Sequence, residues 1–128
     1  MSALSVISVI DDDASVRAAT NNLLKSHGYT VYTFASAEEF LRSAQLNDTS
    51  CVIADVQMAV MSGLDLLTVM RSQGRHAPFI FITAFPDESV RARALKAGAI
   101  GFLSKPFAGP MLIKCVDTAL EERRGGCQ

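Results

Sequence analysis

The sequence lacks the features by which several classes of protein are recognised. Its three cysteines, Cys51, Cys115 and Cys127, are far apart, form no CxxC motif, and have no histidine at metal-ligand spacing. We interpret them as free thiols of a reducing compartment, the first two in the core. No apolar run reaches the roughly 20 residues of a membrane span, and the start, MSALSVISVI, lacks the basic residues and cleavage site of a signal peptide. We therefore expect a cytoplasmic protein without membrane contact.

An excess of charge of either sign is also missing. Twelve basic and 13 acidic residues give a net charge of −1 in 128 residues. Because no basic stripe is present, we expect no direct nucleic acid binding by this domain. Without Asp11, Asp12, Asp13 and Asp55, 12 basic residues would face nine acidic ones, and the remainder would carry +3. Negative charge is thus concentrated at a few positions.

Linkers, low-complexity segments and long repeats are absent too, and we expect one domain over residues 1–128. Short apolar, β-branched runs alternate with longer segments of helical spacing. The predicted strands are 4–10, 29–34, 51–54, 79–83 and 100–103, and the predicted helices are 15–28, 36–45, 62–74, 87–99 and 109–124. Ser36 and Glu39 predict a capping box at the start of the second helix. This alternation predicts an α/β fold, a doubly wound five-stranded parallel sheet with helices on both faces.

Polar residues stand where four of the predicted strands end. In an open parallel sheet, ligands bind outside the carboxyl ends of the strands. The residues at these ends are Asp11 and Asp12 after the first strand, Asp55 after the third, Thr83 in the fourth and Lys105 after the fifth. Taken singly, each has an ordinary interpretation as a loop aspartate, a strand hydroxyl or a solvated lysine. Their common position predicts a functional site.

The types of these residues indicate phosphoryl chemistry with a metal ion. Clustered carboxylates are the oxygen ligands that Mg²⁺ prefers, and an aspartate beside the metal can attack phosphorus to give an acyl phosphate. A lysine would stabilise the transferring group, and a threonine hydroxyl could hydrogen-bond the product. The acidic run is therefore interpreted as holding a cation. Asp13 is left over, and either it or Ser15 is expected to begin the following helix.

The motifs that carry these residues occur in the order and spacing of a known family. They are VIDDDASVR, IADVQMAVMSGLDLL, FITAF and KAGAIGFLSKPF. Over essentially its whole length the chain resembles the receiver domain of two-component response regulators, and in particular the FixJ type, whose receivers usually precede a helix-turn-helix output domain. The resemblance implies a domain that accepts a phosphoryl group from a histidine kinase and controls a transcriptional output. Such a domain is not an enzyme beyond phosphorylating itself from a phosphodonor and slowly dephosphorylating itself.

The resemblance also assigns roles at the acidic cluster. Asp55 matches the phosphoacceptor, and Asp11 and Asp12 match the acidic pair, because Arg17 follows at the family's distance from Asp12. The family's cofactor is Mg²⁺, for which Mn²⁺ can substitute. By this resemblance Asp12 and Asp55 would bind the metal directly, Asp11 mainly through a water, and Gln57 through its backbone carbonyl.

Further roles concern the response to phosphorylation. Thr83 matches the switch hydroxyl, Phe102 the switch aromatic, and Lys105 the family's lysine, whose bond to Pro106 is expected to be cis. Phosphorylation is expected to draw Thr83 toward the site and let Phe102 turn inward from an exposed position. A homodimer would then form through the face of the fourth helix, fifth strand and fifth helix. The alternative, that Phe102 is an ordinary core residue, stays open.

The chain departs from the family in the loop after the phosphoacceptor. The family usually has a Met-Pro-Gly turn there, whereas this chain reads Met58, Ala59, Val60, so the shape of the loop stays open. Two positions at which the family tunes phosphate lifetime hold Gln57 and the bulky, apolar Phe85. Attack of water on the phosphorylated form is therefore expected to be hindered.

Three other functions agree less well with the sequence. A degenerate receiver, which binds partners without phosphorylation, is favoured only by the altered loop at Ala59 and Val60. A Mg²⁺-dependent phosphohydrolase would need a second acidic residue two places after Asp55 as general acid, where Gln57 stands. Flavin binding would need a phosphate-cradling loop after the first strand, where the acidic residues would repel the phosphate.

Overall fold

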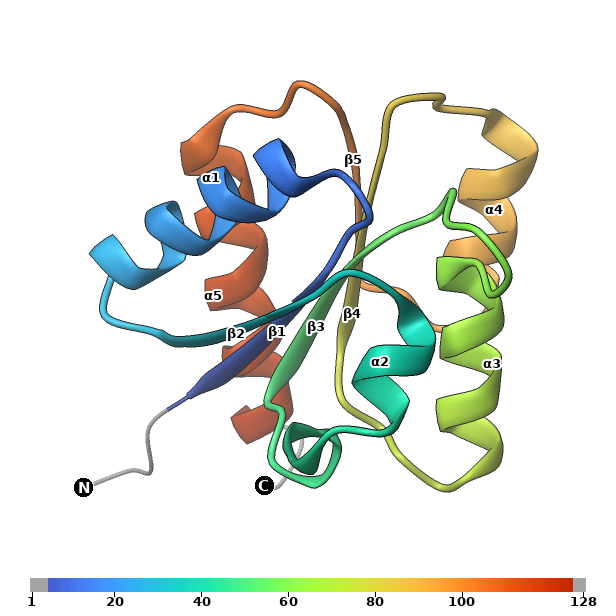
Figure 1. Cartoon of the computed structure of the whole chain (residues 1–128), viewed down its shortest axis with the longest axis horizontal. Coiled ribbons are helices and arrows are strands. Elements are labelled where there is room, and N and C mark those ends of the chain that lie inside the picture. Colours follow the sequence, from blue (N-terminus) through green and yellow to red (C-terminus); the bar gives the residue numbers. More distant parts are fainter. Residues whose placement is uncertain (1–4, 126–128) are drawn as a thin grey trace.

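The computed structural model describes residues 5–125, with side chains for residues 5–121. Residue 4 of the first predicted strand and Cys127 lie outside this part of the chain. Within it, five strands form one parallel sheet in the order β2-β1-β3-β4-β5 (Figure 1). The strands are β1 (Val6–Ile10), β2 (Thr30–Phe34), β3 (Cys51–Asp55), β4 (Phe79–Thr83) and β5 (Gly101–Ser104).

Helices cover both faces of the sheet. Within residues 5–125 they are α1 (Ala14–Ser26), α2 (Ala37–Leu41), α3 (Gly63–Ser72), α4 (Glu88–Lys96) and α5 (Gly109–Gly125), with a 3-10 turn, η1 (Ala44–Asn47), before β3. Helices α1 and α5 lie on one face, and α2, α3 and α4 lie on the other (Figure 1). The predicted doubly wound α/β fold is therefore confirmed.

Each face of the sheet has its own core, and the central strands contribute to both. Along β4, Phe79 and Phe81 pack in the core under α2, α3 and α4, while Ile80 and Ile82 pack in the core under α1 and α5. This alternation follows from the two-residue period of a strand, whose successive side chains point to opposite faces. It explains why the strand reads as a continuous apolar run, which a sheet covered on both faces requires.

The second helix differs from its prediction. A single helix was expected over 36–45, but α2 ends at Leu41, because the side chain and N–H of Ser43 both bond to the Phe40 carbonyl (2.7 and 3.0 Å) and compete with further helical bonds. The capping box also forms only in part. Ser36 Oγ accepts the Glu39 N–H at 3.1 Å, but the Glu39 carboxylate accepts from the N–H of Ala35 at 2.7 Å instead of from Ser36.

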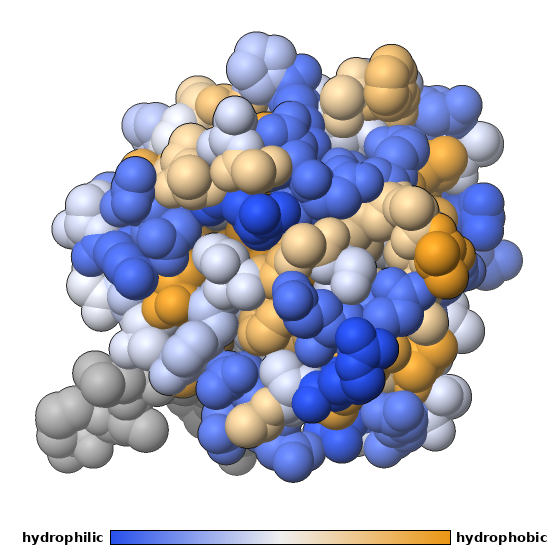
Figure 2. Space-filling view, viewed as in Figure 1, coloured by the Kyte–Doolittle hydropathy of each residue, from blue (hydrophilic) through white to orange (hydrophobic). Residues whose placement is uncertain are grey.

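The cysteines, the helices and the surface can be compared with the predictions from composition. Cys51 is buried as expected, whereas Cys115 is only half-buried, and burial raises the pKa of its thiol. No helix in the described part of the chain combines the length and apolar character needed to cross a membrane. The face seen in Figure 2 is mostly hydrophilic, with hydrophobic residues scattered between polar ones.

Candidate functional site

The sheet brings acidic side chains together where its strand order changes direction. Strand β1 lies between β2 and β3, so the loops that follow β1 and β3 leave the sheet on opposite sides of this point. Ile10 pairs with Ala54, which places the next residue of each segment, Asp11 and Asp55, side by side. One carboxylate oxygen from each of Asp11, Asp12 and Asp55 lies within 4.8 Å of the others.

The three adjacent aspartates have different environments. Asp11 is buried, and its Oδ1 accepts a hydrogen bond from the Asp13 N–H at 2.9 Å. Asp13 is the N-cap of α1, because its Oδ1 accepts from the N–H groups of Ser15 at 2.9 Å and Val16 at 3.3 Å. Asp12 is exposed. Asp13, and not Ser15, therefore begins the helix, and the carboxylates of Asp11 and Asp12 remain for the site.

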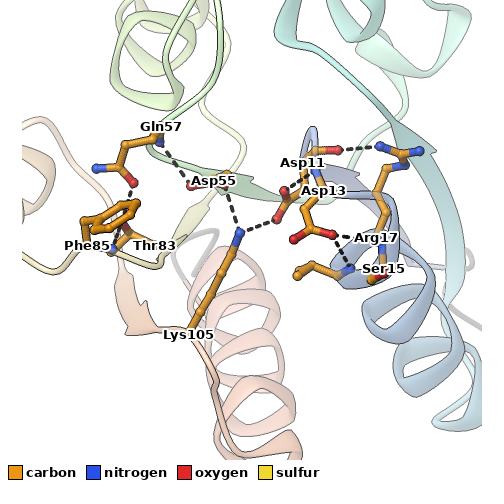
Figure 3. Close-up of polar contacts among 10 residues, drawn as sticks. Asp11, Asp13, Ser15, Arg17, Asp55, Gln57, Thr83, Phe85 and Lys105 are labelled. Carbon is orange, nitrogen blue, oxygen red and sulfur yellow. Dashed lines mark hydrogen bonds and ion pairs between the residues drawn. The ribbon is translucent and has the colours of Figure 1, made fainter.

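Two cations approach this cluster in different ways. Lys105 Nζ lies 2.9 Å from Asp55 Oδ2 and 3.0 Å from Asp11 Oδ2, so one ammonium bridges two carboxylates (Figure 3). The bond between Lys105 and Pro106 is cis, as expected. Arg17 Nη1 donates instead to the backbone carbonyl of Asp11 at 2.7 Å. The guanidinium thus fixes the backbone of the acidic loop and leaves its carboxylates available.

At this site, burial and the neighbouring charges shift the pKa values of Asp11 and Lys105 in opposite directions. Burial raises the pKa of Asp11, and the hydrogen bond from Asp13 and the contact with Lys105 offset this only in part. For Lys105, burial alone would lower the pKa, but its hydrogen bonds to Asp55 and Asp11 outweigh burial, and the pKa is raised. Lys105 is therefore protonated at neutral pH, while an ionised Asp11 carries a desolvation cost that a further cation would offset.

The donor set fits a small divalent cation. Three carboxylates and one ammonium leave two formal negative charges when all four groups are ionised. All the offered ligand atoms are oxygens, which Mg²⁺ and Mn²⁺ accept. Asp12 is exposed, so waters can reach the remaining coordination positions. These residues are thus chemically suited to hold Mg²⁺.

Thr83 lies on the other side of Asp55 from the acidic loop (Figure 3). It is buried at the end of β4, where its hydroxyl donates to the side-chain carbonyl of Gln57 and accepts from the Phe85 N–H at 3.0 Å. The Gln57 N–H in turn donates to Asp55 Oδ1 at 3.1 Å. The contact between the Gln57 side chain and Thr83 was not expected from the sequence, which assigned Gln57 a backbone carbonyl for the metal and a place in tuning phosphate lifetime.

Phe102 is half-buried, in contrast to the exposed position expected for it. Its ring packs against the core under α2, α3 and α4, at the edge of a cavity of about 200 Å³. The cavity is also lined by Pro86, Asp87, Glu88, Arg91 and Ser104. The residue is thus neither a fully exposed aromatic nor a full core residue, and open space adjoins its ring.

Comparison with known proteins agrees with this geometry. Residues 7–117 match the sequence profile of the response regulator receiver domain. The chain belongs to this family. The receiver domain is 41% identical over 120 residues to nodulation protein W of Bradyrhizobium diazoefficiens, covering 94% of this chain and 53% of that protein. It is 36% identical over 116 residues to the transcriptional regulatory protein FixJ of the same species, covering 91% of this chain and 57% of that protein.

Solved structures support the same fold. The chemotaxis protein CheY4 of Vibrio cholerae superposes with a TM-score of 0.84 at 30% sequence identity, over 92% of this chain and 100% of that one. The curated relatives are longer, and this receiver domain spans about half of their length. The resemblance to the receiver family that the sequence motifs indicated, including its FixJ-type members, is therefore confirmed.

The loop after β3 of this receiver domain contains a strained residue. Val60 has a φ of 68°, in the left-handed region, and the Met61 N–H donates to the Ala59 carbonyl at 2.8 Å. A positive φ with a bond between residues two apart is the rare, strained kind of γ-turn. Val60 is 94% exposed, so its side chain gains almost nothing from packing. The departure from the family's turn is thus accommodated by backbone strain.

Replacing Val60 with glycine is expected to stabilise the domain by about 1 kcal/mol. A left-handed conformation costs a residue with a Cβ about 1–2 kcal/mol, and the greater freedom of glycine in the unfolded chain returns part of that gain. Urea denaturation measures the change. The control is Ala59→Gly next to it, where no positive φ occurs and a small loss of stability is expected. Equal effects of both substitutions would contradict strain at Val60.

Gly63, the first residue of α3, is another residue whose importance the sequence did not reveal. A Cβ at this position would lie 2.4 Å from the backbone oxygen of Asp55 and 2.8 Å from the ring of Phe81. The start of α3 therefore passes directly against the end of β3. The available signal was a glycine at the first position of a helix, immediately after Ser62, which caps the helix together with Asp65.

Proposed function

We propose that this receiver domain accepts a phosphoryl group on Asp55 from a phosphohistidine of a histidine kinase, with Mg²⁺ or Mn²⁺ held by Asp11, Asp12, Asp55 and the Gln57 backbone carbonyl. The phosphorylated form then has altered affinity for its partners. One observation carries the proposal. Three carboxylates offer oxygens within 4.8 Å of one another, and the ammonium of Lys105 bridges two of them and lies 2.9 Å from the proposed acceptor.

The proposed chemical step uses Asp55 as the acceptor and Lys105 as the cation beside it. A carboxylate oxygen of Asp55 forms a bond to phosphorus while the bond from phosphorus to the donor nitrogen breaks, and the imidazole leaves with that electron pair. Lys105 lies where it can pair with the oxygens of the transferred group. When bound, the metal supplies positive charge to the phosphoryl oxygens in transfer. Asp11 and Asp12 hold that charge next to the acceptor without taking part in bond formation.

The name of one relative supports a proposal about the output of the domain. One of them is named a transcriptional regulatory protein, and this chain covers 57% of its length. We therefore propose that the receiver domain controls a transcriptional output in the protein to which it belongs.

The phosphorylation itself is tested with acetyl phosphate and Mg²⁺. One phosphoryl group should be added, measured by intact mass, and it should be released by alkali as an acyl phosphate is. Asp55→Asn is expected to abolish the addition completely, because the amide is not a nucleophile. Asp13→Asn, which changes a neighbouring aspartate in the same way and keeps a good helix cap, should leave it intact. Peptide mapping that placed the group on another residue would overturn the assignment.

The same sample tests a proposed homodimer through α4, β5 and α5. Leu95 and Met111 are exposed on α4 and α5 (39% and 51%), among basic side chains on α4 such as Lys96 and acidic ones on α5 such as Glu121. Opposite charges on the two helices would let this face pair with a second copy about a two-fold axis. In sedimentation velocity the phosphorylated domain should be dimeric and the Asp55→Asn variant monomeric. A fully phosphorylated monomer would refute the dimer but not the role of Asp55.

A further inference from the structure

The hydrogen bonds of Thr83 leave its hydroxyl no free proton. The hydroxyl oxygen accepts the Phe85 N–H at 3.0 Å, and its one proton is donated to the side-chain carbonyl of Gln57. A hydroxyl has only one proton to donate, and a carbonyl oxygen cannot donate in return. Thr83 is fully buried, so water does not compete for this proton.

This arrangement conflicts with what phosphorylation would require. A phosphoryl group offers acceptor oxygens and no donors, so a Thr83 hydroxyl that bonds it must donate its proton to it. The proton cannot be given to Gln57 at the same time. Formation of a bond from Thr83 to a phosphoryl group on Asp55 therefore requires the bond to Gln57 to break.

We propose that Gln57 is a positioning residue, a latch that holds Thr83 in the unphosphorylated arrangement and opposes the switch. The inference rests on the proposed function, in which Asp55 carries the phosphoryl group. It adds a role for the Gln57 side chain that is separate from its backbone carbonyl. The latch lowers the fraction of molecules in which Thr83 is free to bond the phosphoryl group.

The position of Gln57 suits a latch that opens when Asp55 is modified. Its backbone N–H donates to Asp55 Oδ1 at 3.1 Å, so the same residue contacts the acceptor and the switch hydroxyl (Figure 3). Gln57 is exposed, so its side chain can swing away and have its amide solvated by water. Release therefore leaves no buried amide without partners.

The size of the effect follows from a single neutral hydrogen bond. After allowance for the bonds to water that replace it, one neutral hydrogen bond changes an equilibrium constant by about two- to tenfold. Removing the Gln57 acceptor should thus raise the population of the switched form by that factor. The fold should be unaffected, because the side chain packs in neither core.

The experiment measures binding of beryllium fluoride, a noncovalent phosphoryl mimic, with Mg²⁺. Backbone amide NMR shifts of Ala84 and Phe85 report the half-saturating concentration. Gln57→Met, which keeps the length and the backbone carbonyl but lacks the amide acceptor, should bind about two- to tenfold more tightly than the unmodified domain. Gln57→Ala should do the same, which guards against a new contact made by the methionine.

A double-mutant cycle with Thr83→Val separates the latch from other effects of Gln57. In the Thr83→Val background the latch is already absent, so Gln57→Met should change the half-saturating concentration by less than the error of the titration. An equal gain in both backgrounds, or no gain in the single variant, would overturn the latch. Such a result would leave the proposed function intact, provided that the unmodified domain binds the mimic and Asp55→Asn does not. Absence of binding in the unmodified domain would overturn both.

Discussion

Replacing Gly63 with alanine is expected to lower the free energy of unfolding by about 3 kcal/mol. The new Cβ would lie 2.4 Å from the backbone oxygen of Asp55, a distance that real Cβ contacts do not show. This oxygen belongs to β3, a central strand bonded on both sides, and the second close atom belongs to the buried ring of Phe81. Neither neighbour can move without disturbing the sheet, so the start of α3 must shift.

Urea denaturation of the Gly63→Ala variant measures this loss. The matched control is Gly109→Ala at the first residue of α5, where a Cβ would lie 3.4 Å from the nearest atom of Leu23, an ordinary contact. That control should change stability by less than about 1 kcal/mol, since alanine favours helix over glycine. Similar losses in the two variants would show that close approach to Asp55 is not the cause. Because the clash involves the proposed acceptor itself, phosphorylation of Gly63→Ala should also be slowed.

The parts of the site that were predictable from sequence depend on strand ends. The alternation of apolar runs and helical segments fixes a parallel sheet, and in such a sheet the carboxyl ends of neighbouring strands meet. This is why Asp11 and Asp55 could be placed together without knowledge of a single side-chain contact. Lys105 followed by the same rule from its place after β5. Asp13 could also be named from the sequence as a candidate cap, because capping depends only on neighbouring residues.

The parts that were not predictable depend on side-chain orientation and on strain. Whether Gln57 turns toward Thr83 depends on rotamers of two residues from different strand ends, which periodicity does not specify. The half-burial of Phe102 depends on how closely α4 packs on β5. The positive φ of Val60 opposes the usual preference of a β-branched residue, and so local propensity predicts the wrong conformation. Such local conflicts are most common near functional sites, where the fold overrides local preference.

Mg²⁺ is expected to raise the thermal stability of the domain through Asp12. Because burial raises the pKa of Asp11, the native state loses stability as the pH rises through that raised pKa and Asp11 ionises. At neutral pH this cost is present, and a cation bound between the carboxylates offsets it. At ten times its dissociation constant, a ligand specific for the native state adds about 1.4 kcal/mol. For a domain of this size that corresponds to a rise in melting temperature of roughly 5 °C.

Differential scanning calorimetry with and without Mg²⁺ tests this expectation. Asp12 is exposed and caps no helix, so Asp12→Ala should leave the metal-free melting temperature within a few degrees of the unmodified value. The rise on addition of Mg²⁺ should disappear, because one of the three carboxylates is gone. Asp13→Asn removes the same charge one residue away and keeps the cap of α1, so its rise should persist. A rise that survives in Asp12→Ala and vanishes in Asp13→Asn would place the cation at the start of α1 instead of between β1 and β3.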